Sequence, residues 1–331
     1  MSELRRDLVS GDWIIMAPER AKRPKFPGVK KSKRIASPIK ECPFEDLTWS
    51  GNWPPILSFP NDAKWEVVLI RNKYPALFHI KGCAQSFKNG PHLIRSGVGE
   101  HDLVITKDHY KNFADISLAH ATEVFKILQR RYKMLAKDEC SVYTSTFFNW
   151  GPSAGASLYH PHYQVLTLPI IPPDIEHSLN GSRRYFAAHR KCVHCVMLDF
   201  DMKEKKRIIE TNSSAIAVVP FVSRVPFEVR IFPKKHFPRF EATPEKTLKG
   251  VAALLQSILK RIRKNIGDPD LNFFIHTAPL KGGSFGYYHW HIEIIPKISN
   301  WGGFELGTGI DINVVDPEMA MAILRGKTPK K

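Results

Sequence analysis

Three polar side chains at alternate positions, His160, His162 and Gln164, follow a loop of small residues and precede an apolar run that ends at Ile171. In an extended chain, residues two apart project from the same face, so these three side chains are expected to form one row with a spacing of roughly 7 Å. One histidine of such a row can be fixed by a metal or a hydrogen bond while its neighbour stays free for reaction. Because Pro161 is unsuited to a central strand, the row is expected at the edge of a sheet.

His162 is the residue that we expect to react. A neutral imidazole can attack a phosphorus centre and form a covalent intermediate. The attack needs donors for the charge on the phosphate, and Gln164, the Ser157 hydroxyl and the backbone N–H groups of the loop from Gly151 can supply them. The alternative is a pair of core histidines with satisfied hydrogen bonds, which suits a single histidine better than this pattern.

Cys192 and Cys195 have the spacing of metal ligands, and His236 and His289 follow them along the chain. Two thiolates and two imidazoles suit closed tetrahedral coordination of zinc, so a structural zinc site is expected in the second half. The alternative is a pair of reduced thiols beside unrelated histidines.

A related set in the first half comprises Cys42, Glu45, His109 and His160, with a carboxylate where a second thiolate would stand. Zinc accepts carboxylate oxygen, so the set predicts a second metal site of altered affinity. A site that has lost its metal and is held by hydrogen bonds is the alternative.

The two sets recur in the same order with nearly the same spacing. His160 follows His109 by 51 residues, and His289 follows His236 by 53. A pattern typical of an amphipathic helix lies between the histidines in each half, at about 116–136 and from about 244 to 262. We therefore predict an α+β fold built by internal duplication, two antiparallel-sheet halves with packed helices, divided into residues 1–175 and 176–331. His291, the counterpart of His162, is expected to have a structural or metal-proximal role together with His276.

The composition is that of an ordinary globular protein, with 331 residues, 43% of them hydrophobic and 24% charged. A net charge of +17 suits a protein that handles anions, and we expect nucleotides rather than nucleic acid because no interleaved aromatic and basic motif occurs. No apolar run is long enough for a membrane span and no signal sequence is evident, so a cytoplasmic protein without membrane contact is expected. Five cysteines without a secretion signal argue against a disulfide framework.

These motifs resemble the galactose-1-phosphate uridylyltransferase family of the histidine-triad superfamily. The similarity extends over nearly the whole chain, and its most specific element is His160-Pro-His162-Tyr-Gln164. The resemblance implies a duplicated histidine-triad-like fold, a homodimer, and transfer of a nucleoside monophosphate through a covalent nucleotidyl-histidine. It also implies that Cys42, His109 and His160 belong to the family's first zinc site, in which Glu45 departs from the usual cysteine.

When the family's residue roles are transferred to the matching positions, the resemblance implies that His162 is the nucleophile and that Gln164 and Ser157 contact the transferred phosphoryl group. It implies nucleotide binding by the loop at Gly151, with Phe304 and Glu305 near the sugar. The other residues implied in nucleotide binding are Arg20, Arg23, Asn72 and Asn149.

The function that the resemblance favours is UDP-glucose:galactose-1-phosphate uridylyltransferase of galactose metabolism, acting on a nucleotide sugar and a sugar 1-phosphate. The segment from Phe304 to Gly309 and the loop before His160 are more similar to a branch that includes plant ADP-glucose phosphorylase, which makes adenylyl transfer to phosphate the alternative. A non-catalytic, zinc-stabilised nucleotide- or RNA-binding protein is a further alternative. A hydrolase is disfavoured, because Gln164 stands where such histidine-triad enzymes tend to carry a third histidine.

Overall fold

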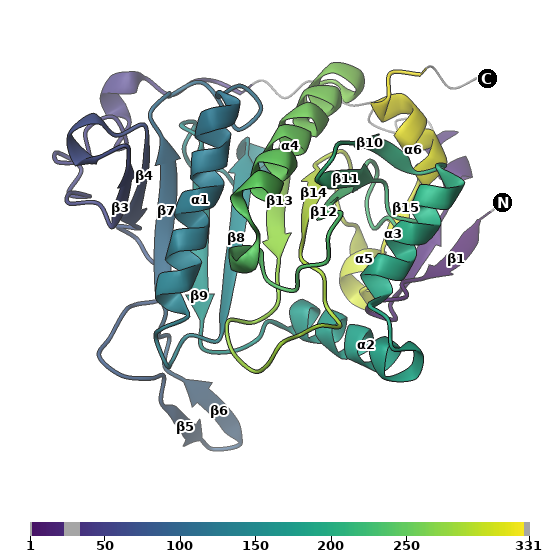
Figure 1. Ribbon diagram of the computed structural model, residues 1–331, viewed down its shortest axis with the longest axis horizontal. Coiled ribbons are helices and arrows are strands. Elements are labelled where there is room, and N and C mark those ends of the chain that lie inside the picture. Colours follow the sequence, from purple (N-terminus) through teal and green to yellow (C-terminus); the bar gives the residue numbers. More distant parts are fainter. Residues whose placement is uncertain (1, 23–33, 328–331) are drawn as a thin grey trace.

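A single antiparallel sheet of ten strands runs through the molecule, in the order β10-β11-β12-β14-β13-β8-β9-β7-β4-β3 (Figure 1). The computed structural model describes residues 2–22 and 34–327, so Arg23 lies outside the described residues. The strands of this sheet are β3 (Leu57–Phe59), β4 (Val67–Arg71), β7 (Glu100–Thr106), β8 (Tyr143–Trp150), β9 (His162–Leu168), β10 (Ile208–Thr211), β11 (Ala215–Val218), β12 (Val229–Pro233), β13 (Leu271–His276) and β14 (His291–Pro296).

Two smaller sheets and the helices surround the large sheet. The small sheets are formed by β1 (Glu3–Arg6), β2 (Trp13–Met16) and β15 (Ile312–Asn313), and by β5 (Ser86–Asn89) and β6 (His92–Arg95). The α-helices are α1 (Leu118–Leu135), α2 (Pro173–His189), α3 (Val193–Glu204), α4 (Glu245–Ile266), α5 (Gly303–Thr308) and α6 (Pro317–Leu324). Short 3-10 helices occur at η1 (Pro18–Lys22), η2 (Ile39–Glu41), η3 (Asp62–Lys64), η4 (Pro152–Ala154) and η5 (Phe240–Ala242).

Helices α1 and α4 lie side by side on one face of the large sheet and form the main core with it (Figure 1). Helix α1 begins after Ser117, whose side chain accepts a hydrogen bond from the N–H of His120, and its apolar stripe is buried against the sheet. The predicted helix at 116–136 is thus confirmed. The other face of β8, β9, β13 and β14 carries His162, Gln164, His276 and Glu293, because alternate strand residues point to opposite faces.

The pairing of the strands confirms the duplication. Asp102 of β7 pairs with Val165 of β9. In the second half, Val229 of β12 pairs with Ile294 of β14. Val229 lies 127 positions after Asp102, and Ile294 lies 129 positions after Val165. These are the same offsets that relate the histidines of the two halves. Strands β8 and β13 pair at the centre, so the halves share one sheet. The boundary expected between residues 175 and 176 stays a prediction.

Each half also holds a loop of the other half through a buried glutamine. Gln129 on α1 donates to the carbonyl oxygen of Phe240 at 2.8 Å, and Gln256 on α4 donates to that of Phe113 at 2.9 Å. Gln256 lies 127 positions after Gln129, and Phe240 lies 127 positions after Phe113, so the two contacts occupy equivalent positions in the two halves. Buried carbonyl groups at the join between the halves are thereby satisfied.

The expectation that the histidine row lies at a sheet edge is wrong. Strand β9 lies between β8 and β7, near the middle of the sheet. Pro161 immediately precedes the strand, whose first residue, His162, pairs with Ile105, so the missing N–H of the proline removes no ladder hydrogen bond. His160 also precedes the strand and its side chain turns toward a different cluster, so the three polar side chains do not form a single row.

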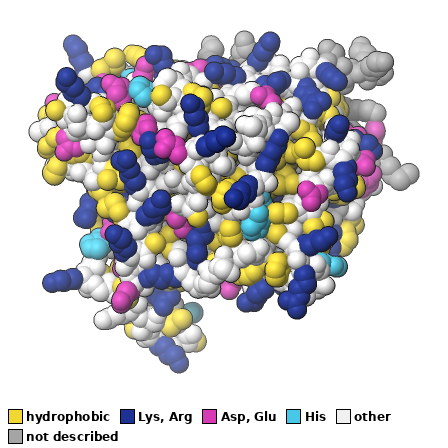
Figure 2. All heavy atoms as spheres, viewed as in Figure 1, with side chains coloured by type: hydrophobic (Ala, Val, Ile, Leu, Met, Phe, Trp, Pro, Cys, Tyr) yellow, Lys and Arg dark blue, Asp and Glu magenta, His cyan; other side chains and the backbone are white. Residues whose placement is uncertain are grey.

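The structure also contains a disulfide between Cys83 and Cys140, which the argument from cysteine number did not foresee. It joins the segment before β5 to the turn between α1 and β8. Basic side chains are scattered over the face in Figure 2 rather than gathered in one stripe. Among the described residues, no helix combines the length and the apolar character needed to cross a membrane.

Candidate functional site

His162 is held with one ring nitrogen committed and the other available. Its Nδ1 lies 2.9 Å from the carbonyl oxygen of His160, so Nδ1 carries the proton and donates it, which leaves the lone pair on Nε2. The residue is only 6% exposed, and this burial lowers the pKa of His162. The edge of the Phe44 ring lies against the imidazole, with the ring centroids 5.4 Å apart. The arrangement fixes a neutral imidazole with a nucleophilic Nε2.

The loop of small residues beside His162 is anchored by the second half of the chain. Asp270 accepts hydrogen bonds from the backbone N–H and the hydroxyl of Ser153, at 2.9 and 2.7 Å. Gly151 has φ +89°, and a Cβ there would collide with the Asp270 carboxylate, so only glycine fits. The N–H groups of residues 153–156 all donate within the chain.

Gln164 belongs to a network on the open face of the sheet that the sequence did not reveal in full. Its Oε1 lies 3.0 Å from His101 Nε2, and Asn72 Nδ2 lies 3.2 Å from the same ring nitrogen. On the neighbouring strands, Asn272 donates to Asn149 Oδ1 at 2.8 Å. The structure therefore places Gln164 beside Asn72 through His101, a residue without any motif around it.

Other residues expected at the site lie elsewhere in the same chain. Phe304 and Glu305 are on α5. This helix lies on the side of the molecule that holds β12 and β14, away from β9 (Figure 1). Glu305 accepts a hydrogen bond from the N–H of Gly302 and so caps its own helix. Arg20 is in η1, directly after β2 of the three-stranded sheet. Ser157 is exposed at the end of its loop.

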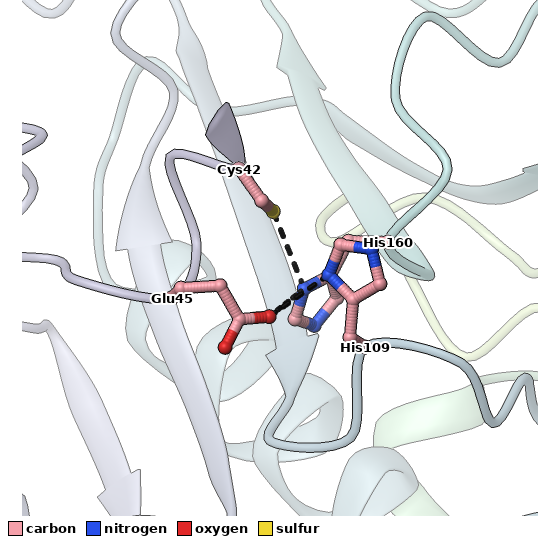
Figure 3. Close-up of side chains that lie close together, drawn as sticks. All are labelled: Cys42, Glu45, His109 and His160. Carbon is pink, nitrogen blue, oxygen red and sulfur yellow. Dashed lines mark hydrogen bonds and ion pairs between the residues drawn. The ribbon is translucent and has the colours of Figure 1, made fainter. Parts of the chain in front are cut away.

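Cys42, Glu45, His109 and His160 converge on one point, as Figure 3 shows, and their ligand atoms all lie within 4.8 Å of one another. His160 Nδ1 lies 3.5 Å from Cys42 Sγ and 3.2 Å from a Glu45 carboxylate oxygen, which is 2.9 Å from His109 Nδ1. A zinc ion with bonds of about 2.0–2.3 Å holds its ligand atoms roughly 3.3–3.8 Å apart. The distance from His160 Nδ1 to Cys42 Sγ lies in this range, and the two shorter distances to the Glu45 oxygen lie below it.

The outward hydrogen bonds of the two histidines support the same conclusion. His160 Nε2 donates to the carbonyl of Thr106 at 2.8 Å, and His109 Nε2 donates to that of Ser37 at 3.0 Å. When each Nε2 donates in this way and Nδ1 carries no proton, both rings direct a lone pair toward the Glu45 carboxylate, an arrangement that a metal ion between them would stabilise. The four residues fit a metal ion, with Glu45 as the oxygen ligand.

The second-half set also comes together. Cys192, Cys195 and His236 have ligand atoms within 4.8 Å of one another, and His289 Nδ1 lies 3.7 Å from Cys195 Sγ. The Cys195 thiol donates to Cys192 and lowers the pKa of Cys192 to about 5, while burial lowers the pKa of His289 to about 3. A thiolate beside imidazole nitrogens is a donor set that zinc prefers.

The position equivalent to the nucleophile in the second half has different neighbours from those of His162. His291 Nδ1 lies 3.2 Å from the His289 carbonyl, as in the first half, but Phe232 stacks on the His291 ring at 4.6 Å between centroids. Glu293 replaces the glutamine and forms an ion pair with Arg230 at 3.3 Å and a contact with His276 at 3.4 Å. A carboxylate there would repel a phosphate, so the site is unsuited to the chemistry of His162.

Comparison with known proteins defines the class. The family described as Domain of unknown function (DUF4921) matches residues 92–325. ADP-glucose phosphorylase of Arabidopsis thaliana is 34% identical over 98% of this chain and 92% of its own length. A galactose-1-phosphate uridylyltransferase of Thermotoga maritima is 28% identical over 98% of both chains. The crystal structure of the Arabidopsis thaliana ADP-glucose phosphorylase with bound ADP-glucose superimposes with a TM-score of 0.84 at 31% identity, covering 100% of both chains.

The duplicated antiparallel sheet and the relatives that match nearly the whole chain define a nucleotidyltransferase. Within that class, the chain belongs to the galactose-1-phosphate uridylyltransferase-like family, which includes both relatives named above. It is an enzyme of the nucleotidyltransferase type.

Proposed function

We propose that this enzyme cleaves ADP-glucose with phosphate, by way of an adenylyl group bound to His162. The observation that carries the proposal is the hydrogen bond from His162 Nδ1 to the His160 carbonyl, which leaves Nε2 as the nucleophile of a buried, neutral ring. Nucleophilic catalysis by a histidine divides the transfer into two displacements at the same phosphorus atom.

In the first displacement, the Nε2 lone pair attacks the α-phosphorus of ADP-glucose. The phosphoanhydride P–O bond breaks, and glucose 1-phosphate leaves with the bonding electrons. The His160 carbonyl accepts the Nδ1–H bond and stabilises the positive charge that develops on the His162 ring. In the second displacement, an oxygen of inorganic phosphate attacks the same phosphorus, the P–Nε2 bond breaks with its electrons returning to the His162 ring, and ADP is released as the product.

Adenine is favoured as the base by the comparisons. The plant phosphorylase is 34% identical to this chain, against 28% for the bacterial uridylyltransferase. The second candidate is therefore uridylyl transfer from UDP-glucose to galactose 1-phosphate, supported by a match to the uridylyltransferase over 98% of both chains. Both reactions use the same nucleophile and differ in base and acceptor.

We also propose that the active enzyme is a homodimer. Phe304 and Glu305 lie far along the molecule from β9, so they reach the sugar next to His162 only from a second copy. Arg20, whose turn follows the three-stranded sheet, is proposed to reach the nucleotide in the same way.

Zinc is proposed at both cysteine–histidine clusters. At the first, Cys42, Glu45, His109 and His160 would hold the ion. Zinc bound there would fix the His160 ring, and the carbonyl of that same residue orients His162. At the second, Cys192, Cys195, His236 and His289 would hold an ion that stabilises the fold.

Intact-protein mass spectrometry after mixing with ADP-glucose or UDP-glucose tests the donor. We expect an adenylyl-sized adduct with ADP-glucose, and release of ADP when phosphate is added. A uridylyl-sized adduct that galactose 1-phosphate discharges would support the second candidate instead. Binding of nucleotide with no adduct from either donor would indicate a non-catalytic binding protein and overturn the proposal.

Adduct formation is expected to depend little on pH across the range in which an exposed histidine titrates, about pH 6–7. Burial lowers the pKa of His162, so its ring stays in the reactive neutral form as the pH falls through this range. The rate is expected to decline only at more acidic pH, where the ring takes up a proton. Single-turnover adduct formation measured against pH checks this, and a decline centred near pH 6.5 would contradict it.

A further inference from the structure

We infer that His101 is a positioning residue that fixes the orientation of the Gln164 carboxamide for phosphoryl transfer. This inference rests on the proposed function. His101 lies in β7, and the strand pairing brings it next to β9 on the open face of the sheet, where its Nε2 is 3.0 Å from Gln164 Oε1.

The protonation state of His101 follows from its other ring nitrogen. His101 Nδ1 lies 3.0 Å from the backbone nitrogen of Ala76, whose N–H can only donate. Nδ1 is therefore an acceptor without a proton, and the proton of the neutral ring is on Nε2.

The proton on Nε2 decides which way Gln164 points. Two groups lie near it, Gln164 Oε1 at 3.0 Å and Asn72 Nδ2 at 3.2 Å. The orientation of Asn72 is fixed because its Oδ1 accepts from the N–H of Tyr74 at 3.0 Å, so its amide nitrogen cannot accept a hydrogen bond. His101 therefore donates to Gln164 Oε1.

A carboxamide whose oxygen is occupied presents its NH₂ group on the opposite side. Gln164 thus turns its NH₂ group, rather than its oxygen, toward a phosphate beside His162. Without His101, the two ends of the carboxamide can exchange by rotation, and the oxygen would then repel the phosphoryl oxygens for part of the time. His101 acts on the reaction through Gln164 and does not itself touch the transferred group.

The test compares two substitutions of His101 in single-turnover adduct formation with ADP-glucose and UDP-glucose. His101→Phe keeps a ring but removes the donor, and it is expected to slow adduct formation roughly 10–100-fold, the usual range for residues that orient a reacting group. His101→Gln carries an NH₂ group that can donate to Gln164 Oε1, and it is expected to restore the rate to within about five-fold of wild type. His92→Phe, an exposed histidine of β6, is the matched control and is expected to leave the rate unchanged.

A double-mutant cycle separates positioning from general loss of structure. If His101 acts through Gln164, the substitution His101→Phe is expected to cause little further loss in a Gln164→Ala background. Equal rates for His101→Phe and wild type, or a full additional loss in that background, would overturn the inference. Wild-type protein that forms no adduct with either donor would instead overturn the proposed function, and thermal unfolding identifies any variant that has lost its fold.

Discussion

Replacing His162 with alanine is expected to abolish the covalent adduct and to reduce turnover by roughly 10⁴-fold or more. No other group described at the site has the geometry to replace it. His160 directs both ring nitrogens at the chain, and its Nε2 is committed to the Thr106 carbonyl at 2.8 Å. Rapid-quench measurement of adduct and product with ADP-glucose, and in parallel with UDP-glucose, gives both quantities.

The His162→Ala variant is also expected to keep its affinity for the nucleotide within a few-fold, because the loop at Gly151 and the side chains of Asn72 and Asn149 remain in place. Nucleotide binding by calorimetry, together with thermal unfolding, separates lost chemistry from a lost fold. An adduct of full size and normal rate on the variant would place the nucleophile on another residue.

Replacing Cys192 with serine is expected to remove one zinc per chain and to destabilise the second half. The pKa of Cys192 is lowered to about 5 by hydrogen bonding from Cys195, which marks Cys192 as the thiolate of the cluster. A serine hydroxyl stays protonated and is a poor zinc ligand. Loss of a structural zinc is expected to reduce the free energy of unfolding by on the order of 3 kcal/mol and to lower Tm by roughly 4 °C.

Metal content by mass spectrometry and calorimetric unfolding check this expectation, with Cys42→Ser as the matched variant. Cys42→Ser is expected to reduce metal at the first cluster alone and to slow adduct formation, since His160 belongs to that cluster and orients His162. Wild-type protein purified with zinc in the medium but holding no metal would contradict both zinc assignments.

The sequence predicted the duplication and the two groups of cysteine, histidine and glutamate residues because both depend on residue types at fixed spacing. The 51- and 53-residue intervals between histidines reflect one strand–helix–strand unit used twice, and the register of β7 with β9 and of β12 with β14 repeats accordingly. His101 and Asp270 were missed because their roles arise from pairing between distant segments. His101 meets Gln164 only through the alignment of β7 with β9, and Asp270 reaches Ser153 from the other half of the chain.

The position of β9 shows a different limit of sequence reasoning. Pro161 indicates correctly that a strand does not run through it, but it does not distinguish a strand at the edge of a sheet from one that begins at the next residue. The sheet order decides between them, and it depends on contacts that no local pattern records. The same holds for the Cys83–Cys140 pair, which the helix α1 and the β5–β6 segment bring together across 57 residues.

The reciprocal glutamine contacts mean that neither half is complete by itself. Gln129 and Gln256 each satisfy a carbonyl group of the opposite half, and β8 has β13 as its neighbour across the centre of the sheet. A chain that contained only one unit would have an unpaired central strand and a buried amide without its acceptor. The same contacts would be satisfied if two such chains associated about a twofold axis, so the present molecule has the internal organisation of a symmetric dimer fused into one polypeptide. In the second half, the counterpart of Gln164 is Glu293, which forms an ion pair with Arg230.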